Sequence, residues 1–347
     1  MKTYCLYTVL LLFACALPVL AAVADPVTLA APAPRDEVLV IIGAPGEADT
    51  FAPGFAAAAK NWQTACARAH IPCTIIGLEE QKDPEASPTD RARVQEWLQK
   101  RDPASRANLW ITYIGHGTFD GKEARMNLRG PDILPADLAA WFKPFMRQII
   151  FIHGGSAGGA PFISALSGPN RIIITATRSG NEVNYARFGE RFAEAVASDD
   201  ADIDQDGQVS LLEAFVYAAQ KVQGFYVDNN RMMTEHPQLD DNGDKASTPA
   251  DFFKGTRVVK QAQPARGGGS APVVDGARAR LVTLAPTDAE RAMTPVQFAL
   301  RETLEQQLEK LRAQKTRLGD DAYYKQLEAL LRQLAALYSP AARAALP

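Results

Sequence analysis

The fold is decided by two stretches near the middle of the chain, Leu109-Trp-Ile-Thr-Tyr-Ile-Gly-His116-Gly117 and Gln148-Ile-Ile-Phe-Ile-His153-Gly-Gly-Ser156-Ala-Gly-Gly159. Each stretch is a short, uninterrupted apolar run that ends at glycines and polar residues. Such a run predicts a strand buried on both faces, which is typical of a parallel sheet covered by helices. In open α/β sheets, sites form outside the carboxyl ends of the strands. We therefore expect His116 and Ser156 to face the same crevice.

Further apolar runs flank this pair and alternate with helical patterns. Strands are expected at residues 37–43, 73–77 and 171–177. Helices are expected at residues 55–70, 89–101, 135–142, 161–166 and 188–197. Strict alternation of strands and helices predicts an α/β fold with a doubly wound, mainly parallel sheet and helices on both faces.

The composition limits the class of protein. The chain has 347 residues, a hydrophobic content of 47% and a formal net charge of −3. It is therefore long enough for one large α/β domain and an appended segment. Basic residues are not gathered into a stripe, so no nucleic-acid partner is expected.

The N-terminus has the pattern of a secretory signal. Residues 1–24 carry one early lysine, an apolar stretch, and Ala22-Val23-Ala24 in front of Asp25. Small residues at these places are typical of a cleavage site. We expect an exported protein, periplasmic or secreted, with no membrane segment after cleavage. The alternatives are a retained anchor helix, for which the stretch is borderline in length, and lipid modification of Cys15.

Two cysteines, Cys66 and Cys73, remain after such cleavage. Export favours a disulfide between them, which would close a short loop between a helix end and a strand start. Two buried free thiols are the alternative.

The C-terminal part of the chain differs in pattern from residues 36–258, the expected α/β domain. Residues 261–276 contain Pro-Ala-Arg-Gly-Gly-Gly-Ser-Ala-Pro, the composition of a flexible linker. In the remaining segment, 277–347, a strand is expected over 277–284. Leucines then recur at three- and four-residue spacing on both sides of Gly319, which predicts a C-terminal α-helical hairpin.

The most specific motif is Asp202-Ile-Asp204-Gln-Asp206-Gly207-Gln208-Val-Ser210-Leu-Leu-Glu213. It matches the twelve-residue EF-hand loop at every ligand position, including the glycine of the sharp turn. The expected Ca²⁺ ligands are the carboxylates of Asp202, Asp204, Asp206 and Glu213, the backbone carbonyl of Gln208, and Ser210 directly or through water.

We expect Ca²⁺ to have a structural role in this loop. Extracellular calcium is plentiful, and sites of this kind in exported proteins are often weak. An acidic loop that only caps a helix is the alternative. A second acidic run, at 239–244, has Lys245 where such a loop needs glycine. That run predicts an Asx-rich turn.

Several short motifs occur together between residues 37 and 257: Gly115-His116-Gly117, the glycine- and serine-rich turn after the next strand, and the stretches 166–182, 206–215 and 235–244. Jointly they resemble the caspase/legumain-like cysteine peptidases, and the bacterial legumain-like branch in particular. The resemblance implies a caspase-like sheet and a peptide or protein as substrate or ligand. It also implies that His116 stands at the place of the catalytic histidine. Gly117 stands where a backbone N–H helps to hold the oxyanion.

The nucleophile position departs from the family pattern. The place of the cysteine falls on Ser156 or on one of the two glycines before it, and no cysteine follows Cys73. A thiolate mechanism at this site is excluded. The resemblance therefore implies a peptidase homologue that is catalytically impaired or inactive and that acts as a peptide- or partner-binding domain.

Two other functions remain open. Ser156 could be a nucleophile with His116 as its base, in an endopeptidase-type acyl transfer. Alternatively, His116 and His153 could ligate a transition metal together with a carboxylate. Ser156 is equally explained as a small residue at a helix entry, and His153 as a buried core residue.

Arg178 follows the last expected parallel strand, where a specificity pocket would lie in the resembled fold. An arginine there would favour an acidic substrate side chain through a bidentate contact. An ion pair with Glu182, four residues on, is the alternative.

Overall fold

The computed structural model describes residues 35–79, 88–263 and 271–339. The expected signal segment and residues 264–270 of the expected linker lie outside these ranges. Within the described ranges, no helix is both long and apolar enough to cross a membrane.

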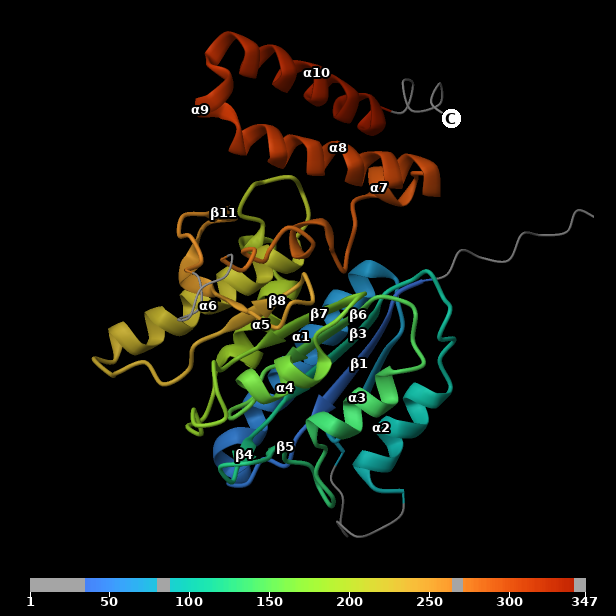
Figure 1. Cartoon of the computed structure of the whole chain (residues 1–347). Coiled ribbons are helices and arrows are strands. Elements are labelled where there is room, and N and C mark those ends of the chain that lie inside the picture. Colours follow the sequence, from blue (N-terminus) through green and yellow to red (C-terminus); the bar gives the residue numbers. More distant parts are fainter. Residues whose placement is uncertain (1–34, 80–87, 264–270, 340–347) are drawn as a thin grey trace, which may run out of the picture. The chain divides into compact units, whose positions relative to one another are not determined.

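A seven-stranded sheet forms the centre of the α/β domain, in the order β2-β1-β3-β6-β7-β8-β9 (Figure 1). The strands β2, β1, β3, β6 and β7 pair in parallel, while β8 runs antiparallel to β7 and β9 to β8. Because β1 lies between β2 and β3, the chain winds outward in both directions, and the predicted doubly wound sheet is confirmed. The bounds are Glu37–Ile42 (β1), Cys73–Ile76 (β2), Leu109–Ile114 (β3), Ile149–His153 (β6), Arg171–Thr175 (β7), Gln238–Asp240 (β8) and Thr248–Pro249 (β9).

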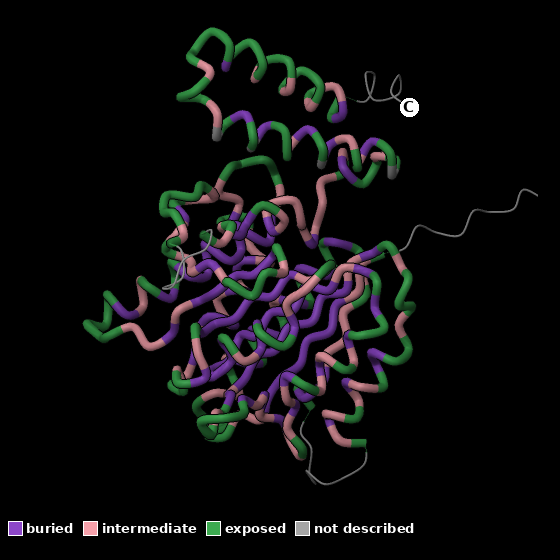
Figure 2. Tube along the Cα trace, viewed as in Figure 1, coloured by how far each residue is buried: buried purple, intermediate pink, exposed green. Residues whose placement is uncertain are grey.

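Helices cover both faces of this sheet (Figure 1). One face carries α1 (Ala48–Ala69), α5 (Phe188–Ala197) and α6 (Leu211–Asp228), and the other carries α2 (Asp90–Gln99), α3 (Pro135–Phe142) and α4 (Gly159–Leu166). Successive strand residues point to opposite faces. In β1, for example, alternate residues enter the two cores. The strands are therefore buried along almost their whole length (Figure 2).

Helix α1 begins earlier than predicted. It starts at Ala48 and includes Pro53 and Gly54, which the sequence pattern places before the helix. Phe55 and Ala58 are buried against the sheet, and this packing outweighs the weak helix propensity of the preceding residues. The bounds of α3 and α5 agree with those predicted.

Two small antiparallel hairpins accompany the main sheet. The first, β4 (Gly117–Phe119) with β5 (Ala124–Met126), follows β3 directly. The second pairs β10 (Phe253–Lys254) with β11 (Arg257–Val258).

The strand predicted over 277–284 is wrong. That segment contains the short 3-10 helix η3 (Ala279–Leu281) and a single bridge between Thr283 and Ser210. A buried carboxylate holds it: Asp241 accepts hydrogen bonds from the backbone N–H groups of Gly276, Arg278 and Ala279 at 3.0, 2.8 and 2.8 Å. A side chain therefore satisfies the backbone donors that a strand would satisfy through its neighbours.

The predicted C-terminal hairpin is confirmed. After the short helix α7 (Asp288–Arg291), α8 (Pro295–Ala313) and α10 (Asp320–Tyr338) pack on each other, joined by α9 (Lys315–Leu318) and by Gly319 with φ of 74°. The leucine stripe is only partly used. Leu304, Leu308 and Leu337 are buried, whereas Leu331 is 47% exposed.

Candidate functional site

His116 lies at the carboxyl edge of the sheet, beside the switch point between β1 and β3. Its Nε2 is 3.2 Å from the carbonyl oxygen of Pro45, in the loop after β1. A carbonyl oxygen only accepts, so Nε2 is the donor in this contact. The rings of Phe51, Phe55 and Tyr185 surround the imidazole, with centroids at 4.6, 5.8 and 5.5 Å. The histidine is thus held in a defined orientation.

Ser156 lies beside Gly117 in the turn after β6, but its hydroxyl is enclosed. The residue is 1% exposed. Its Oγ accepts a hydrogen bond from Gly117 N at 3.0 Å and donates to Gly117 O at 3.3 Å. The backbones approach so closely here that a Cβ on residue 117 would lie 2.0 Å from the Ser156 carbonyl oxygen, which explains the glycine.

The structure therefore brings His116, Gly117 and Ser156 to one edge of the sheet. The His116 ring and the Ser156 hydroxyl, however, form hydrogen bonds with other partners. The hydroxyl proton of Ser156 points to Gly117 O, whereas the His116 ring bonds to Pro45. The N–H of Gly117, expected to hold an oxyanion, is occupied by Ser156 Oγ. Acyl transfer needs the nucleophile within hydrogen-bond reach of its base, and this arrangement does not provide it.

The two glycines before Ser156 offer no place for a side chain. A Cβ on Gly154 would lie 2.5 Å from Gly189 Cα, and one on Gly155 would lie 2.5 Å from Gly115 O. Both contacts are with backbone atoms, which cannot turn aside. A cysteine at either position would require the strand ends to move apart.

The interpretation of His116 and His153 as joint metal ligands is wrong. In the parallel register, His153 stands opposite Tyr113, and both belong to the face covered by α4. There its ring packs between Tyr113 and Phe162, with centroids at 5.2 and 4.4 Å. His116 instead contacts Phe51 and Phe55 of α1, on the other face. Burial lowers the pKa of His153 to about 4, so the ring is neutral at pH 7.

A pair of residues that the sequence interpretation did not assign lies next to Arg178. Glu182 Oε1 is 2.7 Å from Nδ1 of His236, and its Oε2 accepts the backbone N–H groups of Arg178 and His236 at 2.9 and 3.2 Å. Its backbone carbonyl accepts Ala157 N at 2.9 Å, which ties the pair to the Ser156 turn. Sequence distance hid this pair, because Glu182 and His236 belong to different strand-end loops.

Arg178 itself reaches out of the protein. Its guanidinium is 3.7 Å from Glu182 Oε1, and the side chain is 67% exposed. The ion pair expected as the alternative is present, but an exposed pair of this length is weak. The guanidinium can therefore turn to a ligand at small energetic expense.

The calcium-type loop lies at the opposite, amino end of the sheet. Ligand oxygens of Asp202, Asp204 and Asp206 lie within 4.8 Å of one another. Glu213 is directed into the loop, where its Oε1 accepts Ile203 N and Asp204 N at 2.9 and 3.0 Å. Partial desolvation and the charges of Glu213 and Asp202 raise the pKa of Asp204. Such a set of hard oxygens fits Ca²⁺.

The loop also has the geometry of an EF-hand coil. Asp202 accepts Asp206 N and Gly207 N at 3.1 and 2.9 Å, and Gly207 has φ of 90°, a left-handed conformation that favours glycine. Ser210 and Glu213 cap the start of α6 reciprocally. The expected helix-capping role is therefore present, and the residues that cap are also ligand candidates.

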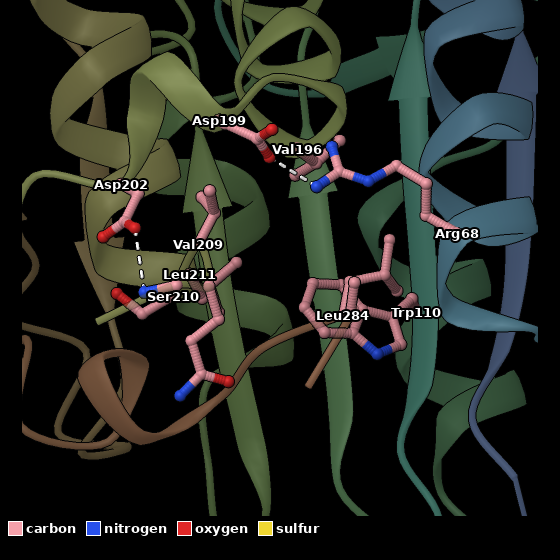
Figure 3. A pocket seen from close by; sticks show the side chains of 12 residues that line it. Arg68, Trp110, Val196, Asp199, Asp202, Val209, Ser210, Leu211 and Leu284 are labelled. Atoms are coloured by element: carbon pink, nitrogen blue, oxygen red, sulfur yellow. Dashed lines mark hydrogen bonds and ion pairs between the residues drawn. The ribbon is translucent and has the colours of Figure 1, made fainter. Parts of the chain in front are cut away.

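A cavity of about 360 Å³ adjoins the loop on the side of α1 and β3 (Figure 3). Figure 3 shows Arg68 of α1 directed at Asp199, with Trp110 of β3 beneath. The Arg68–Asp199 ion pair closes one side of this cavity.

The second acidic run forms the predicted Asx-rich turn. Asp240 accepts Gly243 N and Lys245 N at 2.9 and 3.0 Å, and Asn242 accepts Asp244 N at 2.8 Å. These oxygens are used by the local backbone. Cys66 and Cys73 are free thiols in this structure, and the disulfide stays a prediction.

The comparisons with known proteins bear on the fold. No protein-family model matches the chain, and no curated protein matches it. Among solved structures it is similar to caspase-1 from Spodoptera frugiperda, at 12% identity and a TM-score of 0.38 over 60% of this chain and 86% of that one. It is also similar to a structural-genomics protein from Geobacter sulfurreducens, at 10% identity and a TM-score of 0.40 over 60% and 93%. At these identities the similarity concerns the fold alone.

We predict that His153 makes the protein sensitive to mild acid. Because its pKa is lower in the folded chain than the ordinary 6.5, the unfolded chain binds the extra proton. Stability then falls as the pH drops from about 6.5 to 4, by about 3 kcal/mol for this group. Urea unfolding of His153→Met across this pH range should show a smaller decrease in the free energy of unfolding than the wild type shows. The exposed His70, replaced by Asn, is the control; equal pH profiles for all three proteins would contradict the assignment.

We predict that Ser156 stabilises the turn and does not react. Ser156→Ala leaves the buried N–H of Gly117 without an acceptor and should lower the free energy of unfolding by about 1–3 kcal/mol. Ser167→Ala is the matched control, because the Ser167 hydroxyl has no hydrogen-bond partner, and it should be near neutral. A fluorophosphonate probe should leave wild-type Ser156 unlabelled in intact-protein and peptide mass spectra. Labelling of the wild type that disappears in Ser156→Ala and His116→Ala would contradict this prediction and support the serine hydrolase hypothesis.

Proposed function

We propose that the chain is an exported, calcium-binding homologue of the caspase/legumain-like peptidases that binds peptide segments without cleaving them. The observation that carries this proposal is the enclosure of the Ser156 hydroxyl, which bonds to both the backbone N–H and the backbone C=O of Gly117. Ser156 supplies the hydroxyl at the nucleophile position. The same hydroxyl accepts the N–H of Gly117, which is the donor expected to hold the oxyanion.

The binding half of the proposal rests on what the carboxyl edge retains. His116 keeps a defined orientation, Arg178 is exposed, and Glu182 holds His236 beside it. The side chains of Arg178 and His236 would meet a carboxylate of an extended peptide at the carboxyl edge, where doubly wound sheets bind their ligands. The motif resemblance to the bacterial legumain-like branch supports a peptide or protein ligand, and the signal-like N-terminus supports a periplasmic or secreted location.

The calcium half rests on the donor set. Ligand oxygens of Asp202, Asp204 and Asp206 lie within 4.8 Å of one another. Glu213, Gln208 and Ser210 stand at the remaining ligand positions of the motif, and Glu213 accepts hydrogen bonds from Ile203 N and from the Ser210 hydroxyl. Bound Ca²⁺ would neutralise the mutual repulsion of these carboxylates and hold the loop between α5 and α6. We propose a structural role for it, since the loop lies at the far end of the sheet from His116.

We predict a preference for acidic peptides that depends on Arg178. The probe is a set of fluorescein-labelled, N-acetylated pentapeptides that are identical except for Asp, Asn or Lys at the central position. Fluorescence anisotropy should give the Asp peptide the highest affinity. Arg178→Gln should reduce that preference roughly tenfold, the value of one charge-assisted hydrogen bond, with no peptide cleaved in any sample.

The matched control is Arg332→Gln, which removes an exposed, ion-paired arginine of α10 and should leave peptide affinity unchanged. Equal affinity for the Asp, Asn and Lys peptides would show that Arg178 does not determine specificity. Absence of binding by all peptides at millimolar concentration would contradict the binding function.

We predict one Ca²⁺ site per chain, with a dissociation constant of about 10⁻⁴ to 10⁻³ M if it behaves as an extracellular module. Isothermal titration calorimetry should detect it in the wild type and lose it in Asp204→Ala. Asp244→Asn, in the second acidic run, is the control and should bind as the wild type does. Calcium uptake that survives Asp204→Ala would place the ion elsewhere.

A further inference from the structure

Glu290 of α7 is a buried carboxylate that joins the calcium-type loop to the C-terminal helices. Its Oε1 accepts Gln208 Nε2 of the loop at 2.9 Å and the Tyr338 hydroxyl of α10 at 2.7 Å, and it forms an ion pair with Arg301 of α8. Both Glu290 and Arg301 are buried. One oxygen atom therefore links the loop with three helices of the C-terminal segment.

The backbone makes a second link beside the first. Leu211 N donates to Val282 O at 2.7 Å, and the Thr283 hydroxyl donates to Val209 O at 3.0 Å. Ser210 and Thr283 form the bridge between the two segments. The last residues of the loop are thus joined by one antiparallel bridge to the segment that leads into the C-terminal helices.

Elsewhere, a cavity separates the loop from α8. It measures about 440 Å³, and its wall includes Asp204, Asp206 and Glu213 on the loop side and Lys310 on the helix side. Close packing therefore contributes little to this junction on the cavity side. The hydrogen bonds of Gln208 and of residues 209–211 contribute to the connection, and these bonds depend on the conformation of the loop backbone.

A bound Ca²⁺ would act on that conformation through electrostatics. Three carboxylates lie within 4.8 Å of one another, and like charges at this distance repel. In the EF-hand pattern, Gln208 gives the ion its backbone carbonyl, while its side chain amide is the group that reaches Glu290. When the backbone of Gln208 is held by the ion, its side-chain amide starts from a defined position beside Glu290, which favours the hydrogen bond between them.

We infer that Ca²⁺ binding to residues 202–213 fastens the C-terminal helices α7, α8 and α10 to the α/β domain through Gln208 and Glu290. The inference rests on the proposed calcium site. By linkage, fastened helices raise the affinity of the loop for Ca²⁺ by the same factor by which the ion stabilises the fastened state. The C-terminal segment is a calcium-dependent strap.

Hydrogen–deuterium exchange of the full chain tests this strap, in buffer with Ca²⁺ and in buffer with a chelator. In the wild type, backbone amides of α8 and α10 should exchange roughly fivefold or more slowly with Ca²⁺ present, the lower end of typical coupling. Gln208→Ala keeps the backbone carbonyl for the ion but removes the link to Glu290. It should bind Ca²⁺ and show a clearly smaller difference in exchange between the two buffers, because only the backbone bonds of residues 209–211 remain.

Two further variants separate the link from general damage. Tyr338→Phe removes the hydroxyl that ties α10 to Glu290 and should make the exchange of α10 less dependent on Ca²⁺. Gln333→Ala removes an exposed amide of α10 that bonds only within its own helix, to Ala329 O, and should behave as the wild type.

Calorimetry on the same samples distinguishes the outcomes. Ca²⁺ uptake with equal helix exchange in both buffers would overturn the strap and leave the calcium site standing. No uptake by the wild type would overturn the calcium site and the strap with it. Slowing in Gln208→Ala as large as in the wild type would overturn the route through Gln208 and Glu290.

Discussion

The two hydrogen bonds between the Ser156 hydroxyl and the Gly117 peptide group join the turn after β6 to the start of β4. They close the carboxyl edge of the sheet at the point where a doubly wound fold would hold a ligand. The close approach of the two backbones requires a glycine at 117, and the packing of Gly154 and Gly155 against their neighbours leaves no room for a larger nucleophile. The same contacts that stabilise this edge therefore occupy the Ser156 hydroxyl.

Polar groups divide between the two ends of the sheet. The carboxyl end holds His116, His236 and Arg178, with Glu182 as the carboxylate that bonds to His236. The amino end holds the acidic loop of residues 202–213. The proposed ligands differ accordingly: an anionic peptide group at the carboxyl end and a hard cation at the amino end.

Buried and half-buried carboxylates fasten the irregular parts of this protein. Asp36 accepts Asn108 N and the indole N–H of Trp110 at 2.7 and 2.8 Å, while Glu235 accepts Phe188 N at 3.0 Å. Burial raises the pKa of both groups, and the donated hydrogen bonds oppose that rise. Burying a carboxylate is costly unless donors surround it. Each of these residues is therefore placed where several N–H or O–H groups converge, as are Asp241 and Glu290.

The sequence by itself determined the elements with short-range signals. Apolar runs of strand length produced the parallel sheet, because a strand buried on both faces needs apolar side chains on both. Helical leucine spacing produced α8 and α10, and the spacing of Asp202, Asp204 and Asp206 produced the compact oxygen cluster. These features depend on residues within one turn or one loop, so their pattern is readable along the chain.

Only the tertiary structure decided what the candidate site contains. Register places His153 on the face opposite His116, and the close approach of two backbones turns the Ser156 hydroxyl toward Gly117. The pairing of Glu182 with His236 and that of Gln208 with Glu290 join residues far apart in sequence. Sequence periodicity carries no information on such pairs, because their distances are set by how helices and loops pack on the sheet.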